Sequence, residues 1–485
     1  MEQLDVLIIG AGLSGIGAAA RLKARCPERT FAILEGRHAL GGTWDLFRYP
    51  GIRSDSDMQT LGYDFKPWRA EKSIADGPAI REYVTETADE NGIHPHIRYC
   101  HKLRRAAWSS DENRWVVEVE KTDSGEMIRL ACGLLLMCSG YYRYDQGHEP
   151  SFEGSEDFTG PIVHPQFWPE ALDYTGNRIA VIGSGATAVT LVPAMAEQAA
   201  HVTMVQRSPT YVVSRPDRDL IANRLRKLLP DRWAYALTRF KNIQLQRFMY
   251  DRTRKQPDKV KAALLEMVRK QLGPHYDVEK HFTPTYAPWD QRLCLVPNGD
   301  LFEAIKSGRA SVVTDRIDRF TESGIQLESG EKVEADIIVT ATGLELEVLG
   351  GVEFEVDGKR VDFAETWTYK GMMYSDVPNL VQTFGYINAS WTLRADLTSE
   401  YVCRLLNRMK DVGAARAVPR LMETEQDMPA RPWIDGFTPG YMTRAMHLFP
   451  KQGDHAPWQN TQNYTQDKQI VRKAPLEDGR LRLES

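Results

Sequence analysis

The predicted fold class of this 485-residue chain is α/β, and three features of the sequence predict it. Two short runs rich in aliphatic residues, Leu4–Ile9 and Arg178–Ile182, each lead into a glycine-rich turn, and residues of helical character follow each turn. Such strand–turn–helix units build sheets whose parallel strands are buried on both faces. A basic stretch at 218–280 carries apolar residues at helical spacing. We therefore predict two Rossmann-like dinucleotide-binding domains with a helical insertion.

The first unit contains the pattern GAGLSG, from Gly10 to Gly15. In this pattern Gly10 permits a tight turn, Gly12 lets the backbone approach a pyrophosphate, and Gly15 allows close packing of the helix. Glu35 ends the next strand, where a carboxylate accepts a hydrogen bond from a ribose. The strand, the helix and the second strand are expected at residues 4–9, 16–25 and 31–34. This agreement favours a nucleotide site over a purely structural turn.

The second unit contains GSGATA, followed by a helix through Ala196 and a strand at residues 202–205. Here the strand ends on Gln206 and Arg207 instead of an acid. An arginine at this position, with Ser208 beside it, can bind a 2′-phosphate, so the second site should prefer NADPH to NADH. The alternative is a solvated surface arginine. The residues expected to surround the phosphates are Gly183, Ser184, Gly185, Thr187 and Ala188.

Two dinucleotide sites in one chain predict electron transfer between two cofactors, for which NADPH and FAD are the natural pair. A late strand at 335–340, which runs into ATG, is interpreted as a return of the chain to the first domain. The expected division is an FAD-binding domain at 1–145 and 335–485, the second part including the C-terminal segment, an NADPH-binding domain at 146–217 and 286–334, and a helical insertion at 218–285.

The predicted insertion is basic, with sixteen Lys or Arg against seven Asp or Glu between Arg218 and Lys280. Its apolar residues recur at the spacing of amphipathic helices. We interpret it as a solvated helical cap over the active site, with peripheral contact to an anionic membrane as the minor alternative.

Composition limits the function classes. The formal charge of -5 lacks the basic excess of a nucleic-acid-binding protein. Six cysteines without a CxxC pair indicate neither a zinc site nor a redox disulfide, and no other metal site is expected. The first residues run directly into a strand, and no apolar run approaches the roughly 20 residues that cross a bilayer. A cytoplasmic enzyme acting on a small molecule is expected.

Two longer motifs carry a family resemblance. FTGPIVHPQFWP places Phe158, Gly160, His164, Trp168 and Pro169 in the spacing FxGxxxHxxxWP, and GGTWDLFRYPGIRSD is a second match. Both resemble fingerprints of type I Baeyer-Villiger monooxygenases, in the flavin-containing monooxygenase superfamily. The similarity covers essentially the whole chain and is closest to the ethionamide-activating branch, through segments such as GSGATAVTLVPA and PWDQRLCLVPNGDLF.

The resemblance implies that NADPH reduces FAD and that the reduced flavin captures O2 as a C4a-peroxide, which converts a ketone into an ester or lactone. Sulfide or thioamide oxidation by the same protein is also implied. Arg292, in WDQRLCL, matches the catalytic arginine of the family. A fixed cation there would stabilise an anionic peroxide, and Asp55 would hold that cation in place. The alternative for Arg292 is a salt bridge between domains.

The resemblance also assigns cofactor contacts. It places eight residues around FAD: Ser14, Glu35, Gly42, Thr43, Trp44, Asp45, Asp55 and the backbone of Leu103. It places Arg53, Gly183 and Arg207 near NADPH. Gln291 stands where many family members carry a lysine that contacts the 2′-phosphate, so NADPH selectivity is expected to depend mostly on Arg207.

His164 lies in the expected linker between the two cofactor domains. We interpret it as a hinge residue that makes a structural hydrogen bond, not as a general base. Phe158, Trp168 and Pro169 would brace the same connection.

The substrate is expected to be a small ketone or sulfide, used together with O2. Asn388, Trp391 and Leu393, in the segment 385–397, are candidates to contact it. Three other functions stay open: an N- or S-oxygenase with the same cofactors, a flavin disulfide reductase, which requires a close cysteine pair, and a non-catalytic flavoprotein used as a binding module.

Overall fold

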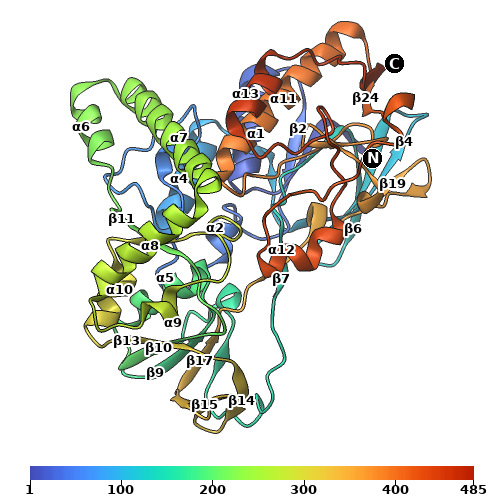
Figure 1. Cartoon of the computed structure of the whole chain (residues 1–485). Helices are drawn as coiled ribbons and strands as arrows, with labels where there is room; N and C mark the ends of the chain where they lie inside the picture. Colours follow the sequence, from blue (N-terminus) through green and yellow to red (C-terminus); the bar gives the residue numbers. More distant parts are fainter.

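The computed structural model describes all residues from 1 to 485. Two β-sheets form two lobes, a nine-stranded sheet at the upper right of Figure 1 and a five-stranded sheet at its lower edge. Long helices from the middle of the chain lie on the left of the view. This architecture confirms the predicted α/β class with two dinucleotide-type sheets and a helical insertion.

The larger sheet has the strand order β20-β19-β4-β5-β6-β1-β2-β3, and β23 pairs with β6 off this path. Strand β1 lies between β6 and β2 and is parallel to both. Its residues Val6, Leu7 and Ile8 are fully buried because both faces of the sheet are covered, which explains the continuous aliphatic run. The strands are β1 (Glu2–Ile9), β2 (Phe31–Leu34), β3 (Ile97–Arg98), β4 (His101–Ser109), β5 (Arg114–Lys121), β6 (Met127–Met137), β19 (Glu353–Val356), β20 (Lys359–Arg360) and β23 (Leu380–Gln382).

Helices from both ends of the chain cover one face of this sheet. Helix α1 follows β1 directly and packs against α11 and α4, while α13 packs on α11. The opposite face carries a separate core that includes Trp108, Trp115 and Phe354. The helices of this lobe are α1 (Leu13–Arg25), α2 (Thr43–Leu46), α3 (Met58–Leu61), α4 (Gly77–Glu90), α11 (Trp391–Val412), α12 (Gly440–Ala445) and α13 (Tyr464–Lys473).

The smaller sheet has the order β13-β10-β9-β17-β8, and all its strands are parallel. Helix α5 connects β9 to β10, which reproduces the second predicted strand–turn–helix–strand unit. The elements are β8 (Ile162–Val163), β9 (Arg178–Ile182), β10 (His201–Gln206), β13 (Ala310–Thr314), β17 (Ile337–Thr340), α5 (Ala186–Met195) and α10 (Asp300–Lys306).

One assignment from the sequence is wrong. The strand at 335–340 was expected in the first domain, but β17 lies inside the smaller sheet, between β9 and β8. Its four core residues are all buried. A short apolar strand fits the interior of either parallel sheet, so its composition carries no information about which sheet accepts it. The chain leaves the smaller lobe only after β17, through Ala341 and Gly343.

The predicted helical insertion is present and contacts both lobes. Helix α7 packs on α3 in the larger lobe, where Arg239 donates hydrogen bonds to the carbonyls of Gln59 and Gly62. Helix α8 packs on α10 and on β11 in the smaller lobe. The helices are α6 (Leu220–Leu228), α7 (Asp231–Lys255), α8 (Pro257–Leu272) and α9 (Val278–Phe282). No helix of the protein has the length and apolar character required to span a membrane.

Short strands complete the fold. The antiparallel pair β7–β18 lies where the chain passes between the lobes, and β24–β25 joins the last residues to the larger lobe. The remaining strands are β7 (Tyr142–Gly147), β11 (Val212–Arg215), β12 (Cys294–Pro297), β14 (Ile317–Thr321), β15 (Gly324–Leu327), β16 (Lys332–Glu334), β18 (Leu344–Leu346), β21 (Thr368–Tyr369), β22 (Met373–Tyr374), β24 (Arg416–Pro419) and β25 (Leu481–Glu484).

Candidate functional site

A cavity of about 720 Å³ lies between the two lobes and is lined by residues of both. Its size lies within the range of ~300–1,000 Å³ that is usual for small-molecule sites. The predicted site residues that line it are Gly10, Gly12, Ser14, Glu35, Gly42, Thr43, Trp44, Arg53, Asp55, Leu103, Thr187, Arg292 and Trp391. The structure therefore brings residues from eight separate stretches of the chain to one space.

The first glycine turn lies at the floor of this cavity. Gly10 has a φ of +101°, and a Cβ added there would lie 2.6 Å from the carbonyl oxygen of Cys138. A Cβ on Gly15 would lie 1.9 Å from the carbonyl oxygen of Gly10. Helix α1 begins directly after Gly12, so its first amide groups point toward the cavity and can bind phosphate. Gly15 itself does not line the cavity but keeps the helix against the strand.

Glu35 is buried at the carboxyl end of β2. Its Oε2 accepts a hydrogen bond of 2.8 Å from the amide of Ala11, and its Oε1 accepts one of 3.0 Å from the amide of Arg37. Burial raises the pKa of the Glu35 carboxyl, and the two amide hydrogen bonds counteract part of the increase. The carboxylate thus closes the glycine turn and also faces the cavity where a ribose is expected.

Among the other residues predicted to contact FAD, Ser14 and Gly42 lie at the first glycine turn, whereas Asp45 lies outside the cavity lining. Trp391 donates a hydrogen bond of 2.8 Å from Nε1 to Oγ of Ser14, which ties α11 to the first turn. Gly42 lies against Gly12, at a φ of +56°. Asp45 differs from expectation because its fully buried carboxylate lies outside the cavity lining. It pairs instead with three arginines, Arg37, Arg48 and Arg81. Its direct contact with a cofactor is therefore not supported.

The second glycine turn is more open than the first. Gly183 has a φ of +139°, and a Cβ on it would meet the carbonyl oxygen of Ala341 at 2.3 Å, but a Cβ on Gly185 would meet nothing within 4 Å. Oγ of Ser184 donates a hydrogen bond of 2.9 Å to the carbonyl of Ser208. Helix α5 begins after Gly185, and its residue Thr187 lines the cavity.

Arg207 lies at the end of β10 and is exposed. Among the ion pairs of the protein none involves this residue, although fifty pairs join other charged groups. Its guanidinium is therefore free to bind an anion. Gly183, Ser184, Gly185, Ala188, Arg207 and Ser208 lie outside the lining of the cavity. Of the second turn, Ala186 and Thr187 reach it.

Arg292 and Asp55 meet at the wall of the cavity, with 4.0 Å between Nη1 and Oδ2. The Arg292 side chain is 39% exposed, its exposed part faces the cavity, and its Nε has no hydrogen-bond partner. Protein atoms of both lobes surround the two side chains at the cavity wall. This burial raises the pKa of Asp55, and the nearby charges of Arg292 and Arg53 lower it in part. A guanidinium therefore faces the cavity, while its unpaired Nε lies buried behind the exposed part.

A group of tyrosines surrounds Arg292 and was not predicted from the sequence. Burial by itself would lower the pKa of Arg292, but Tyr141, Tyr441, Tyr142 and Asp55 together hold it above its ordinary value. Tyr141 also stacks on Trp391, with 5.0 Å between ring centroids. The run GYYRY after the apolar strand β6 could have indicated Tyr141 and Tyr142, because it follows the carboxyl end of a parallel strand.

Arg53, predicted to lie near NADPH, forms an ion pair with Asp300 at the start of α10. It also lines the cavity. The pair joins the loop after Pro50 to the smaller lobe. A role for Arg53 in nucleotide binding requires this pair to open or to share its charge.

The fingerprint segment lies in the smaller lobe, where it contacts the strands that pass between the lobes. His164 is buried, its Nε2 lies 3.2 Å from the carbonyl oxygen of Gly343, and its Nδ1 accepts a hydrogen bond from the amide of Gln166. Burial lowers the pKa of His164, so the ring is neutral at pH 7 and Nε2 donates to the carbonyl. Gly147 packs against the ring, where a Cβ would lie 2.2 Å from it.

The other fingerprint residues stabilise the same region. Phe158 is part of the core below the smaller sheet, and Gly160 permits close approach, because a Cβ there would meet the Asp336 carbonyl at 2.2 Å. Trp168 contacts Tyr174 edge-on, and the Pro169 carbonyl accepts a hydrogen bond from Leu172. None of these residues lines the cavity. Their geometry agrees with a connecting role, and the hinge function stays a prediction.

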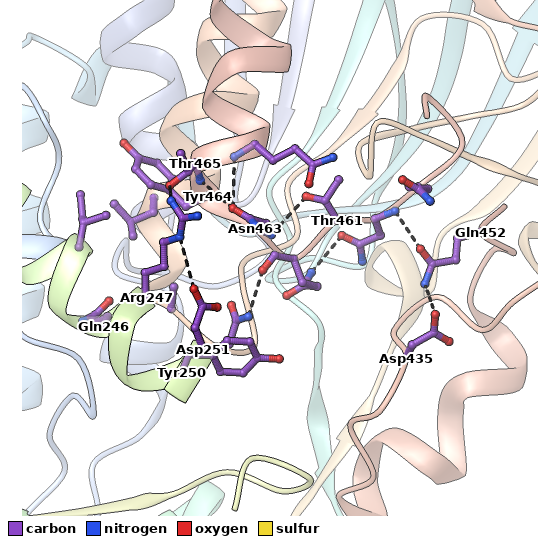
Figure 2. A pocket seen from close by; sticks show the side chains of 18 of the residues that line it. Gln246, Arg247, Tyr250, Asp251, Asp435, Gln452, Thr461, Asn463, Tyr464 and Thr465 are labelled. Carbon is purple, nitrogen blue, oxygen red and sulfur yellow. Dashed lines mark hydrogen bonds and ion pairs between the residues drawn. The ribbon is translucent and has the colours of Figure 1, made fainter. Parts of the chain in front are cut away.

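The three candidate substrate residues separate in the structure. Trp391 lines the large cavity, whereas Asn388 and Leu393 line a second pocket of about 350 Å³. Figure 2 shows this second pocket between α7 and the polar segment 459–466, with Arg247 and Tyr250 on one side and Thr461 and Asn463 on the other. Ala389 lines both spaces, so the two adjoin at the loop before α11.

Comparison with known proteins places the chain in a family. The profile described as "Flavin-binding monooxygenase-like" matches residues 74–350, and one described as "NAD(P)-binding Rossmann-like domain" matches residues 8–70. The chain is 54% identical over 482 residues to the FAD-containing monooxygenase EthA of Mycobacterium tuberculosis, which covers 99% of this chain and 98% of that protein. It is 53% identical to EthA of Mycolicibacterium smegmatis, over 97% of this chain and 95% of that one.

Solved structures with the same fold include a steroid monooxygenase with bound NADP and a cyclohexanone monooxygenase with bound ε-caprolactone. The first has a TM-score of 0.73 and 24% identity, and covers 86% of this chain and 87% of that chain. The second has a TM-score of 0.72 and 20% identity, and covers 86% and 90%. The chain therefore belongs to the flavin-binding monooxygenase-like family, which confirms the enzyme class predicted from its sequence.

Proposed function

We propose that the protein is an NADPH- and O2-dependent flavin monooxygenase of the Baeyer-Villiger type, which uses FAD to convert a ketone into an ester or lactone. The observation that carries the proposal is the pair of Arg292 and Asp55 on the wall of the cavity between the lobes. The cation lies in the same space as the first glycine turn and the start of α5.

The residues of the larger lobe fit FAD. The glycines at 10 and 12 leave room for a pyrophosphate at the start of α1, and Glu35 is positioned for a ribose hydroxyl. The cavity extends from there past Thr43 and Trp44 to Arg292, which gives space for a flavin ring. When bound, FAD would accept electrons from NADPH and pass them to O2.

The residues of the smaller lobe fit NADPH. Helix α5 begins at the second glycine turn, so its amides can bind the pyrophosphate, and the unpaired Arg207 can bind the 2′-phosphate. Thr187 lies on the cavity side of this helix, so the nicotinamide end of the nucleotide would enter the same space as the flavin.

Arg292 supplies the electrostatic part of the reaction. The oxygen that attacks a ketone carbonyl carries negative charge, and this charge passes to the carbonyl oxygen as the new bond forms. A fixed guanidinium at the cavity wall lowers the free energy of both charges. Its neighbours keep the pKa of Arg292 above the ordinary value, so it does not lose its proton at working pH. Asp55 orients the guanidinium from one side and leaves Nε unpaired.

The names of related structures support the substrate class. Two structures of the same fold are named for a steroid and for cyclohexanone, and one of them holds a lactone. Those proteins are distant in sequence, so a ketone substrate for this chain depends on the proposal and its test. The specific ketone is set by side chains that meet the flavin, such as Trp391.

The deciding experiment compares Arg292→Ala and Arg292→Lys with the natural protein. With NADPH, O2 and a methyl ketone, we expect Arg292→Ala to lose ester formation by about 100-fold or more, as for loss of a preorganised oxyanion donor. Its bound FAD should stay unchanged, and NADPH consumption should end in hydrogen peroxide. The lysine variant, which keeps the charge, should recover part of the coupling. Unchanged ester yield in Arg292→Ala would contradict the proposal.

The same assay separates the alternatives. A protein that oxidises a thioether but no ketone would be an S-oxygenase of the same family. A protein that binds FAD but never oxidises NADPH would be a binding module. A disulfide reductase requires a cysteine pair beside the flavin, and Cys138 is the single cysteine that lines the cavity.

A further inference from the structure

Large apolar side chains that are exposed to solvent concentrate in one part of the molecule. Nine of the sixteen exposed large hydrophobic residues lie between residues 220 and 249, in helices α6 and α7. The most exposed are Leu228 at 78%, Trp233 at 66% and Phe240 at 64%. We call this set the α6–α7 face: Leu220, Ile221, Leu228, Trp233, Leu237, Phe240, Leu245, Phe248 and Met249. A patch of this extent on a folded protein indicates an interaction site.

Helix α7 carries this face as a stripe along one side. Trp233, Leu237, Phe240 and Phe248 are separated by four, three and eight residues, which places them on one side of a helix with 3.6 residues per turn. The opposite side is buried and holds the helix to the protein through Arg239. In Figure 1, α6 lies at the left edge of the molecule, and α7 runs from the upper left toward its middle. The stripe is therefore directed outward, with no partner within the chain.

Positive charges surround the α6–α7 face. Six exposed cations of α6, α7, α8 and the turns between them take part in no ion pair: Arg224, Lys227, Arg232, Arg252, Lys255 and Lys259. Over the same helices, the exposed acids Asp231, Asp251 and Glu266 are paired with Arg or Lys, and Asp258 is the one exposed acid without an ion pair. The net field of this region is therefore positive, although the whole chain has a formal charge of -5.

We propose that the α6–α7 face docks on the surface of an anionic lipid bilayer. Apolar side chains of a helix that lies in the interface bury in the acyl boundary while nearby Lys and Arg contact lipid phosphates, and Trp and Phe are typical of such helices. A second copy of the chain is a poorer partner for this face, because it would bring the same unpaired cations together. Because no helix can span a membrane, the contact is peripheral.

The exposed apolar side chains favour membrane contact, the minor alternative for the basic stretch, over a purely solvated cap. The sequence favoured a solvated cap because apolar residues at helical spacing are normally directed into the protein. The structure shows that only some of these apolar residues are directed into the protein. Ala234 and Tyr235 pack inward, whereas Trp233, Leu237 and Phe240 are exposed. Surface docking adds to the proposed oxygenase function and does not depend on it.

The test is flotation of the purified, flavin-loaded full-length protein with vesicles. One set contains phosphatidylcholine alone and the other phosphatidylcholine with phosphatidylglycerol. The apolar variant carries Trp233→Ser, Phe240→Ser and Phe248→Ser, and the charge variant carries Arg224→Glu, Lys227→Glu and Arg232→Glu. The matched controls change exposed residues elsewhere, Met127→Ser with Val412→Ser, and Lys332→Glu with Lys359→Glu and Arg360→Glu.

We expect the natural protein to float with the anionic vesicles, with an affinity that falls as salt is added. The charge variant should bind them roughly 100-fold more weakly, and the apolar variant at least roughly tenfold more weakly. Both controls should bind like the natural protein, and all variants should keep their flavin, which shows that they fold.

Three outcomes would overturn the proposal. The first is that the natural protein does not float with anionic vesicles. The second is that the apolar or charge variant floats as well as the controls. The third is that the natural protein forms a dimer by light scattering which the apolar variant abolishes, without vesicle binding, since the face would then join two copies of the chain.

Discussion

The two glycine turns of this protein use the same pattern but differ in how completely the rest of the chain encloses them. The first turn is closely packed on the side away from the cavity: an added Cβ on Gly10 or Gly15 would meet backbone within 3 Å, and Glu35 accepts two backbone hydrogen bonds beside it. The second turn is open at Gly185, and its strand ends on the exposed, unpaired Arg207.

This difference between the two turns is the one expected between a cofactor that stays bound and a cofactor that exchanges during catalysis. The first turn lies in the cavity between the lobes beside the buried Glu35, whereas a nucleotide on the second turn would bind through the exposed Arg207. We therefore infer that FAD stays bound through many catalytic cycles and that NADPH binds and leaves from the second lobe. The four predictions below change one turn while leaving the other intact.

Gly15→Ala should have the largest effect. The new methyl group would lie 1.9 Å from the Gly10 carbonyl, so α1 must move away from β1. We expect a loss of about 3 kcal/mol in the free energy of unfolding and nearly complete loss of flavin, measured by denaturant unfolding and by absorbance. The matched control is Gly185→Ala, where a methyl group meets nothing within 4 Å. Equal destabilisation by both variants would show that the turns do not differ.

Glu35→Ala should come next. It leaves the amides of Ala11 and Arg37 without acceptors, and each unsatisfied buried donor costs about 1–3 kcal/mol. We expect the protein to purify largely without flavin and to regain it only at high FAD concentration. The KM for NADPH of the reconstituted protein should stay unchanged. Normal flavin retention by Glu35→Ala would show that Glu35 does not belong to the cofactor site.

Arg207→Ala should leave the flavin in place and weaken NADPH. Loss of a hydrogen-bonded contact to a charged phosphate costs about 1.5–3 kcal/mol, which corresponds to a KM for NADPH that is roughly 10- to 100-fold higher. The KM for NADH, which lacks the 2′-phosphate, should not change. Steady-state kinetics with both nucleotides measures the effect. A parallel loss with NADH would indicate a general defect of the second lobe instead.

The smallest effect concerns pH. Burial raises the pKa of Glu35, so its ionised form costs free energy at neutral pH, and this cost disappears as the pH falls through the raised pKa. The protein without flavin is therefore not weakened by acid at this residue. Flavin binding is weakened by acid, because a protonated Glu35 no longer carries the negative charge that accepts hydrogen bonds from the two amides and the ribose. We expect flavin release on acidification to begin above the ordinary glutamate range, and Glu35→Gln to remove this step.

Much of the candidate site could be predicted because it lies in contiguous patterns. Local geometry fixes a glycine turn, the strand before it and the residue that ends the next strand. Gly10, Glu35 and Arg207 accordingly lie at or next to the ends of strands that the sequence predicts. Arg292 came from a family resemblance, and it does face the cavity. The tyrosines around it come from distant segments, Tyr141 after β6 and Tyr441 in α12, and no local pattern joins them.

Asp45 and the strand at 335–340 show where local patterns fail. The sequence around Asp45 does not reveal that three arginines, one of them in α4, converge on its carboxylate. Likewise, the composition of β17 predicts a buried parallel strand but not which sheet contains it. Both depend on contacts between residues far apart in the chain, which a linear reading does not contain.

The sequence by itself determined the α/β class, the two nucleotide turns, the helical insertion and the residues that end each strand, because hydrophobic period and glycine spacing act over a few residues. The tertiary structure decided which lobe received β17, how the first turn was enclosed, and which side of α7 remained exposed. These properties are set by packing between distant segments, since burial depends on what the rest of the chain places against a surface.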